Sequence, residues 1–557
     1  MKPGSYILAL LALLATLSLH SCNSESKTIK NMGTVCKVWG FLKYHHPNIS
    51  VNNIDWDNEL FRIVTEVSKR ENSGRVNDIL SNWIDSLGEL PVSNKEKYID
   101  SLDYRIKPDN RWIADLDPKL YGKLSAIESF TGNFSNKYIN FPIPAAPGYP
   151  QFNEEGYADA DYGDLNFRML TLFRYWNVIN YYYPYKHLID REWNDVLTEF
   201  VPLFMQADNR EEVIMLIHKL TSSIDDSHTS LMYPMGMNPM EVLPELYRKN
   251  RVPIAYSYIE NQVVVSQIYD SAFSADSDIR IGDLITHIDG VPMKSVIEEY
   301  YPYYTGSNYE ATMYKVMQRL NTTNDEHMRL SIRRSGETFQ KDINIADVSQ
   351  DMSKWIPIAN EEKPAYRLIG DEVGYFDAGK ITPVQLDSMM LLFKDTKGII
   401  ADLRGYPRVF NIIELFLSPG TPFTTVYTND EKNPGAYYNF QQRIPNHNRS
   451  IYGGKLVIVA DIRTMSAAET MAIALQSTPT AYTIGSRTTG ANGNVVVCPL
   501  PFGISALFSG IGMAYPDNTE MQRVGIKIDL VAERTVNDIR DNSDNVLDKA
   551  IAYIRAN

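Results

Sequence analysis

Residues 455–490 read KLVIVADIRTMSAAETMAIALQSTPTAYTIGSRTTG and combine short apolar runs with a turn of small residues. Leu456 to Ala460 is rich in Val and Ile and too short for a globular helix, so we predict a buried strand. The apolar-periodic run that ends at Leu475 predicts a helix, and Ala481 to Ile484 predicts a second buried strand. Ser466 therefore lies where a strand turns into a helix.

Two interpretations of Ser466 follow from this position. Serine is a favoured N-cap, so its hydroxyl can simply cap the helix. A helix N-terminus also leaves backbone N–H groups unpaired and carries positive potential. A serine oxygen at this point can attack a carbonyl, and the neighbouring amides can stabilise the tetrahedral product. This stretch alone leaves both interpretations open.

The alternation of strand and helix extends on both sides of this unit. Val373 to Phe376 and Gly398 to Leu403 predict strands, whereas Pro383 to Phe393 and Val409 to Leu417 predict helices. A last helix, Val546 to Ile554, closes the chain. Alternation of this kind is typical of an α/β domain with right-handed crossovers, which we place at residues 350–557.

Residues 245–346 change to short β-rich runs. Within them, residues 280–293 (RIGDLITHIDGVPM) resemble the core of a PDZ domain. That resemblance implies that a peptide is accepted as an added strand, with Ile281, Gly282 and Asp283 as peptide-binding residues. Any small β-barrel with an Asp-Gly turn is the alternative interpretation.

An internal repeat occupies residues 30–90 and 167–232. Trp39 aligns with Trp176 and Trp56 with Trp193, both at an offset of 137 residues. Duplication of a helical unit is the simplest account, and we interpret the aromatic residues as packing between helices. We therefore predict one helical unit at 23–140, an extended Pro- and Gly-rich linker at 141–166, and a second helical unit at 167–240.

The N-terminal residues 1–22 predict a targeting segment. Lys2 precedes an apolar stretch, and Leu19-His20-Ser21-Cys22 resembles the lipobox of bacterial lipoproteins. This resemblance implies acylation at Cys22 and a lipid anchor in the bacterial cell envelope, either periplasmic or at the surface. An ordinary secretory signal with an incidental cysteine is the alternative. Cys36 and Cys498 are the two other cysteines, and we predict no disulfide framework.

Length and charge limit the remaining possibilities. A chain of 557 residues is expected to form two to four domains. A net charge of −14 argues against nucleic acid or an anionic membrane surface as a partner. No phosphate loop, dinucleotide fingerprint or Cys/His metal cluster is recognisable, so we predict no cofactor and no metal. The sequence does not indicate the oligomeric state.

The turn at residues 466–469 (SAAE), followed by residues 484–490 (IGSRTTG), resembles the nucleophile segment of the carboxyl-terminal processing, or tail-specific, serine peptidases. The resemblance implies that Ser466 is the nucleophile. Many members of that family carry a lysine base at the position of Ala491, so the Ser–Lys mechanism is not expected here. Residues 397–407 (KGIIADLRGYP) resemble the family's oxyanion loop, which implies oxyanion amides among Gly405, Arg408 and Ala467.

The tricorn-like branch of the same family implies the base. Its Ser-His pair matches Ser227-His228, so the resemblance implies His228 as the base and Ser227 as its neighbour in a Ser–His–Ser–Glu tetrad. The glutamate position matches Gln522, which can orient a hydroxyl but cannot stabilise an imidazolium by charge. Glu520 or Asp226 are alternative orienting groups, between which the sequence does not decide.

These inferences combine into one hypothesis and one rival. The fold class is α+β and multidomain, with helical N-terminal repeat units, a PDZ-like β domain and an α/β catalytic domain of the crotonase/ClpP type. The predicted function is an envelope-anchored serine endopeptidase that cleaves peptides or protein C-terminal regions through an acyl-enzyme on Ser466. The alternative is a catalytically impaired homologue that binds peptides or other ligands.

Overall fold

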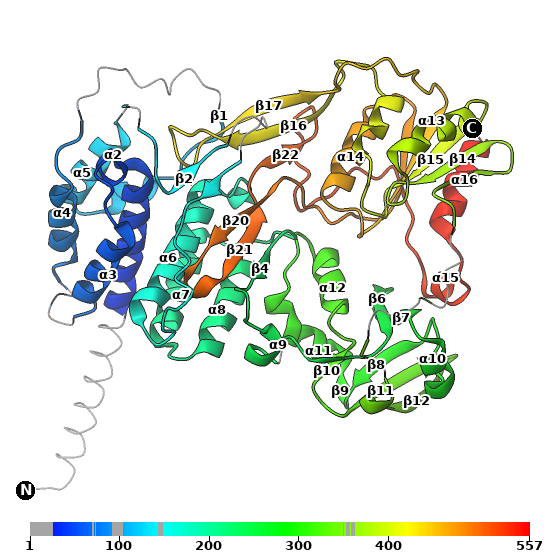
Figure 1. The fold of residues 1–557 in the computed structure, drawn as a ribbon, viewed down its shortest axis with the longest axis horizontal. Coiled ribbons are helices and arrows are strands. Elements are labelled where there is room, and N and C mark those ends of the chain that lie inside the picture. Colours follow the sequence, from blue (N-terminus) through cyan, green and yellow to red (C-terminus); the bar gives the residue numbers. More distant parts are fainter. Residues whose placement is uncertain are drawn as a thin grey trace, which may run out of the picture.

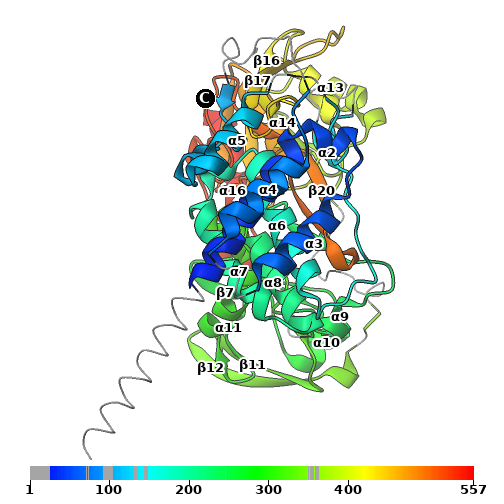
Figure 2. The same ribbon diagram turned by 90° about the vertical axis from the view of Figure 1, so that its left-hand side faces the viewer.

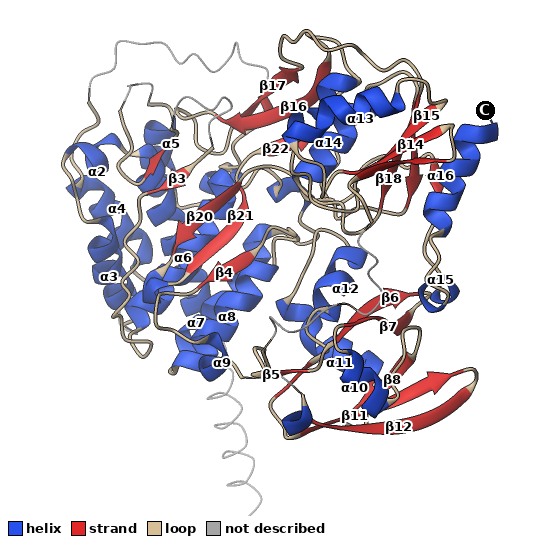
Figure 3. Ribbon diagram, turned by 45° about the vertical axis from the view of Figure 1, so that its right-hand side comes forward, coloured by secondary structure: helices blue, strands red, loops and turns tan. Residues whose placement is uncertain are grey.

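The structure is a computed structural model that describes residues 26–69, 72, 74–91, 104–130, 132, 134–142, 149–244, 246–348, 350–351, 357 and 363–556. The predicted targeting segment and Cys22 lie outside the described residues. Within them, the apolar helices are all too short or too polar to span a bilayer. Helices dominate the N-terminal part, and the strands of the C-terminal half gather in separate groups beside it (Figures 1 and 3).

Two helical units form the N-terminal part, and α3 of the first packs against α6 of the second (Figure 2). The first unit contains a helix over residues 26–45 and the second contains the matching helix α6. The helices of the first unit are α2 (Pro47–Val51), α3 (Trp56–Val67), α4 (Val76–Ser86), η3 (Arg111–Asp115) and α5 (Pro118–Glu128). Those of the second are α6 (Leu165–Tyr182), η4 (Lys186–Leu188), α7 (Trp193–Gln206), α8 (Arg210–Ser222) and α9 (Pro239–Val242).

The same tryptophan pair fixes each helical unit. The ring N–H of Trp39 donates to the carbonyl of Trp56, and the ring of Trp56 donates back, both at 3.0 Å. Trp176 and Trp193 exchange the same two bonds at 2.8 and 2.9 Å. A buried indole N–H needs an acceptor. Because of this exchange, all four tryptophan rings are buried with their N–H groups hydrogen-bonded.

A buried ionic cluster joins the two units to the segment between them. Lys43 lies 2.8 Å from Glu154, and Arg174 lies 2.5 Å from Asp57 and 3.2 Å from Glu154. All four side chains are almost fully buried. The predicted linker therefore contributes a charged side chain to the interior, and it also forms β3 (Gln151–Phe152), which pairs with β2 (Ile139–Asn140).

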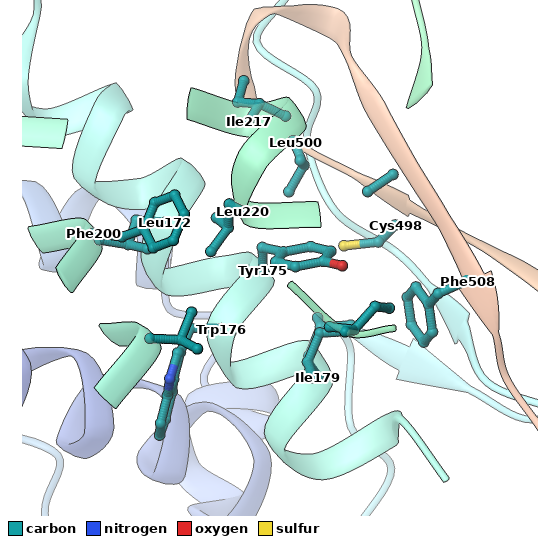
Figure 4. Close-up of a cluster of buried hydrophobic side chains, with 14 of the residues drawn as sticks. Leu172, Tyr175, Trp176, Ile179, Phe200, Ile217, Leu220, Cys498, Leu500 and Phe508 are labelled. Carbon is teal, nitrogen blue, oxygen red and sulfur yellow. The ribbon is translucent and has the colours of Figure 1, made fainter. Parts of the chain in front are cut away.

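Helix α6 packs against a small sheet that comes from the far end of the chain. This sheet has the order β20-β21-β4 and consists of β20 (Val495–Pro499), β21 (Ser505–Ser509) and β4 (Ser230–Met232). Figure 4 shows Tyr175 and Ile179 of α6 beside Cys498 and Phe508 of the two long strands. The C-terminal half thus packs against the second helical unit next to β4, which begins two residues after His228.

The predicted PDZ-like region is a sheet with helices on it. Its strand order is β12-β11-β8-β7-β6, with β9 paired to β8. The strands are β6 (Ile254–Ile259), β7 (Gln262–Ile268), β8 (Leu284–Ile288), β9 (Val291–Pro292), β11 (His327–Arg334) and β12 (Glu337–Asn344), and β5 (Asn250–Arg251) pairs with β10 (Thr322–Thr323). The helices are α10 (Ser271–Ser277), α11 (Met293–Tyr300), η5 (Tyr301–Tyr303), α12 (Tyr309–Met317) and η6 (Ile345–Asp347).

The predicted α/β region is built on the sheet β13-β14-β15-β18-β19-β23, in which only β13 runs antiparallel to its neighbour. Leu456 and Ile458 face α14, whereas Val457 and Val459 face α16. The strands are β13 (Tyr366–Ile369), β14 (Val373–Asp377), β15 (Gly398–Asp402), β18 (Lys455–Ala460), β19 (Ala481–Gly485) and β23 (Leu530–Val531). The helices are η8 (Pro383–Gln385), α13 (Leu386–Phe393), η9 (Phe410–Leu415), α14 (Ala467–Gln476), η10 (Pro501–Gly503), α15 (Val536–Arg540) and α16 (Asn545–Ala556).

A fourth group of strands links this domain to the first helical unit. Its order is β1-β17-β16-β22, with β1 (Tyr104–Ile106), β16 (Pro422–Asn429), β17 (Tyr437–Arg443) and β22 (Gly512–Ala514). The sequence pattern had not predicted these strands. Among the predicted elements, the strands at 456–460, 481–484 and 373–376 are confirmed, but the helix predicted at Val409–Leu417 is wrong in type, because only a short 3₁₀ helix, η9, forms there.

Candidate active site

Ser466 lies in a strained turn at the start of α14. Its backbone has φ 56° and ψ −118°, in the left-handed half of conformational space that non-glycine residues seldom occupy. Such strain costs about 1–3 kcal/mol and persists where the surroundings impose it. The N–H of Ser466 donates to the carbonyl of Ala491 at 3.0 Å, while the N–H of Ala467 has no hydrogen-bond acceptor among the described residues. The turn thus presents a serine beside a free amide.

Glu469 fixes the loop that faces this turn. One carboxylate oxygen accepts from the Thr488 hydroxyl at 2.6 Å and from the Gly490 N–H at 2.8 Å, and the other accepts from the Ala491 N–H at 3.0 Å. Complete burial raises the pKa of Glu469 to about 7, although these hydrogen bonds oppose the shift. The carboxylate is therefore an anchor between α14 and the 488–491 loop.

Gly405 offers a second free amide near the same edge of the sheet. Strands β15 and β18 are parallel neighbours, so the segments that follow them leave the sheet side by side, and the Thr464 hydroxyl donates to the Leu403 carbonyl at 2.9 Å. The Gly405 N–H has no acceptor among the described residues, whereas the Arg408 N–H donates to the Ala378 carbonyl at 3.1 Å. Of the three predicted oxyanion amides, those of Ala467 and Gly405 are therefore available and that of Arg408 is already used.

His228 follows α8 on a short turn that leads into β4. Its ring is 6% exposed, and Nδ1 lies 2.8 Å from the hydroxyl oxygen of Ser509 on β21. Burial lowers the pKa of the His228 imidazole below its usual value, Asp226 opposes this change, and Lys315 reinforces it. The ring is consequently neutral near pH 7, as a general base must be.

Ser227 contacts the PDZ-like region instead of the imidazole. Its N–H donates to the Ser307 hydroxyl at 2.8 Å, and the Ser307 N–H donates back to the Ser227 hydroxyl at 2.7 Å. Within the described part of the chain, neither Ser227 nor Gln522 forms a hydrogen bond with the His228 ring. The predicted tetrad is thus not assembled through direct hydrogen bonds between these side chains.

Two hydrogen-bonded routes connect the His228 turn with the Ser466 turn. One runs through β21: Gly510, beside Ser509, donates to the Asn494 carbonyl at 2.8 Å, three residues after Ala491. The other runs through the start of α12: the Asn308 amide donates to the carbonyls of Thr488 and Thr489, both at 3.0 Å. No hydrogen bond joins the His228 ring directly to Ser466 in the described residues. Catalytic hydrogen bonds often tighten only when substrate binds, so the missing bond does not exclude a nucleophile–base pair.

Gln522 and Ala491 replace charged groups at the positions that the sequence analysis had singled out. Gln522 is buried, its side-chain oxygen accepts from the Asn492 N–H at 3.2 Å, and its amide nitrogen has no hydrogen-bond partner among the described residues. Ala491 is completely buried, and its methyl group supplies no basic nitrogen at that position. The other candidate orienting carboxylate, Glu520, is engaged elsewhere, because it accepts from the Tyr427 hydroxyl and pairs with Arg105, both at 3.1 Å.

The predicted peptide-binding residues of the PDZ-like region lie against the C-terminal part of the chain. Ile281 packs with the apolar side chains of α15, and a Cβ on Gly282 would come within 2.9 Å of the Arg540 Cβ. Asp283 is buried and its two oxygens each accept from the Arg334 guanidinium at 2.7 Å. In this structure α15 therefore covers Ile281 and Gly282, and Arg334 occupies the carboxylate of Asp283.

Sequence reasoning missed Ser509, Asn308 and the anchoring role of Glu469. Glu469 was part of the recognised Ser-Ala-Ala-Glu pattern, and the capping-box spacing from Ser466 could have indicated its contact with the turn. Ser509 and Asn308 carried no sequence signal, because each reaches the site only through contacts between distant segments.

Comparison with known protein families gives a match in the α/β region. Residues 372–532 match the family described as Peptidase family S41. No protein with curated annotation matches the chain. A structure of mature CPAF complexed with lactacystin is similar, with a TM-score of 0.54 and 13% identity over 71% of this chain and 99% of that chain. Another structure of mature CPAF has a TM-score of 0.51 and 14% identity over 68% and 94% of the two chains.

The family match lies where the strained serine, the buried glutamate and the free amides lie. At identities this low, the likeness to the solved structures shows a shared mixed α+β multidomain fold and nothing more. Together with the match at residues 372–532, it makes the α/β region of this chain similar to the serine-type peptidases of family S41.

Proposed function

We propose that this protein is a serine endopeptidase that cleaves peptides or C-terminal regions of proteins through an acyl-enzyme on Ser466. The proposal rests mainly on one observation, the strained backbone of Ser466 at the N-terminus of α14 beside the free N–H of Ala467. A serine that merely caps a helix has extended backbone angles, and it does not need this strain. Strain of this kind is characteristic of a nucleophile held at a strand-to-helix turn.

The reaction follows from the available groups. His228 takes the proton of the Ser466 hydroxyl as the oxygen attacks the scissile carbonyl, and the amides of Ala467 and Gly405 stabilise the negative oxygen that forms. The protonated imidazole then gives its proton to the leaving amine, so the peptide bond breaks and an ester on Ser466 remains. Water, activated by the same imidazole, hydrolyses this ester and restores the free serine.

The cellular setting is part of the same proposal. The lipobox-like sequence that ends at Cys22 supports a lipid anchor in the bacterial cell envelope, at a residue outside the described part of the chain. A peptide captured by the PDZ-like region as an added strand would pair with β6 or β12, the two edge strands of that sheet among the described residues.

Labelling with a fluorophosphonate tests the proposal directly. The reagent should phosphonylate Ser466 in the wild-type protein, fail to label Ser466→Ala, and label His228→Ala on the order of 10² to 10⁴ times more slowly, since that is the usual effect of removing a general base. Ser477→Ala, which changes a serine at the other end of α14, serves as the matched control. A folded wild-type sample that resists labelling would count against the peptidase.

A binding protein is the second candidate, and one observation favours it. The His228 ring and the Ser466 hydroxyl share no hydrogen bond among the described residues, and Gln522 carries no charge with which to orient a base. Under this alternative, peptide affinity would survive Ser466→Ala, and incubation with a diverse peptide pool would yield no new termini by mass spectrometry. Cleavage products that disappear in Ser466→Ala would exclude it.

A further inference from the structure

The His228 ring is held by a strand that lies far from it in the sequence. Nδ1 lies 2.8 Å from the Ser509 hydroxyl oxygen, and Ser509 is completely buried at the end of β21. Because Nδ1 is hydrogen-bonded to Ser509, the other ring nitrogen, Nε2, is the atom left to exchange a proton with the hydroxyl of Ser466. Which nitrogen carries the hydrogen therefore decides whether the ring can act as a base.

A single carboxylate fixes both partners of this contact. One oxygen of Asp226 accepts from the backbone N–H of His228 at 3.0 Å, and the same oxygen lies 3.8 Å from Nδ1 of the ring. The other oxygen accepts from the Ser509 N–H at 2.8 Å. The Asp226 side chain is fully buried, so its negative charge acts on the ring with little screening by solvent.

The other charged groups around the turn are committed elsewhere. Asp225 lies 3.7 Å from Arg523 and accepts from the Asp190 N–H at 3.2 Å. Lys315, on α12, donates to the carbonyls of Thr229 and Thr305 at 3.3 and 3.1 Å. Burial lowers the pKa of Lys315 to about 8, with Asp226 opposing the shift. Asp226 is accordingly the nearest carboxylate that the structure gives to the His228 ring.

We infer that Asp226 and Ser509 are positioning residues for His228, and that Asp226 supplies the orienting charge that Gln522 lacks. This inference rests on the proposed function. A negative charge beside Nδ1 favours the form of the ring with hydrogen on Nδ1, which donates to the Ser509 oxygen and leaves Nε2 free to accept the proton of Ser466. When Nε2 accepts that proton, the same charge stabilises the imidazolium.

The test measures the rate of Ser466 phosphonylation as a function of pH in four variants. Asp226→Asn should lower the plateau rate on the order of 10² to 10⁴-fold, by analogy with a triad aspartate, and move the midpoint of the pH profile to lower pH. Ser509→Ala, which keeps the backbone contact with Asp226, should lower the rate and leave the midpoint nearly unchanged, and Ser509→Thr should restore part of the rate. Asp225→Asn, the matched neighbour, should change neither quantity.

The outcomes distinguish a failure of the positioning role of Asp226 and Ser509 from a failure of the proposed peptidase activity. If His228→Ala slows labelling but Asp226→Asn and Ser509→Ala keep the wild-type rate and midpoint, the positioning role is refuted and the peptidase stands. If His228→Ala labels as fast as the wild type, both are refuted. Asp226→Asn could fail to fold, because Asp226 holds two backbone amides; in that case the Ser509→Ala and Ser509→Thr pair decides alone.

Discussion

Glu469 should make the stability of the α/β region depend strongly on pH. Its pKa rises from 4.5 to about 7 in the folded protein because the carboxyl is fully buried. A group whose pKa is raised on folding stabilises the fold fully below its unfolded pKa and loses that contribution as the pH rises through its folded pKa. Each pKa unit corresponds to about 1.4 kcal/mol. Between pH 4.5 and pH 8, ionisation of Glu469 should therefore lower the free energy of unfolding by about 3 kcal/mol.

Hydrogen exchange is the suitable assay, because all seven tryptophans precede residue 372, where the family match begins, so their fluorescence does not report directly on the segment around Glu469. Mass spectrometry of peptides that cover residues 466–492 gives the free energy of opening at each pH, once intrinsic exchange rates are taken into account. Glu469→Gln should lose the pH-dependent part, so the difference from the wild type should change by about 3 kcal/mol across the window. Glu431→Gln, which alters an exposed carboxylate, should run parallel to the wild type.

The reasoning would be refuted if the wild type and Glu469→Gln differed by a constant amount at every pH. A constant difference would mean that Glu469 contributes only hydrogen bonds and that its ionisation is equally costly in the folded and unfolded chain. The hydrogen bonds from Thr488, Gly490 and Ala491 would then offset burial completely.

Two further substitutions test the packing that positions the site. Gly40→Ala should lower the free energy of unfolding of the helical units by about 1–3 kcal/mol, measured by urea unfolding with tryptophan fluorescence. The new Cβ would lie 1.9 Å from Asn177, and this overlap outweighs the gain in helix propensity. Adding Asn177→Gly should restore the stability, whereas an unchanged stability in Gly40→Ala alone would contradict the close contact. Arg404→Met should lower the free energy of opening in the hydrogen-exchange assay by about 3–5 kcal/mol. The buried Asp402 would lose both of its bonds to the guanidinium, and Asp544 would lose its ion pair with Arg404. If adding Asp402→Asn restored none of this free energy, the explanation by an unpaired buried charge would be wrong.

The inner strands β14, β15, β18 and β19 could be predicted from the sequence because they are buried along most of their length, whereas the outer strands β13 and β23 are more exposed and were not predicted. An unbroken apolar run such as that in β18 indicates a strand covered on both faces, and its predicted start differs from the observed one by one residue. The strands β16, β17 and β20 were not predicted. The strand β16 is buried but rich in polar residues, β17 is mostly exposed, and β20 alternates between exposed and buried positions. Their placement depends on contacts between segments hundreds of residues apart.

The candidate site was predictable only in part for the same reason. Ser466 stands in a local pattern of strand, turn and helix, so its position could be read from neighbouring residues. His228 could be proposed only through a family resemblance. The partner of its ring, Ser509, lies 281 positions further along the chain and follows no motif. Local patterns predict elements, whereas the assembly of a site depends on how those elements are brought together.

Trapping of the acyl-enzyme tests the central claim most directly. The protein is mixed with an activated peptide ester, quenched in acid within milliseconds to seconds, and mapped by mass spectrometry for the acylated residue. We expect a burst of acylation on Ser466 in the wild type, and formation on the order of 10² to 10⁴ times slower in His228→Ala. An adduct on another residue, or an undiminished rate in His228→Ala, would contradict the account.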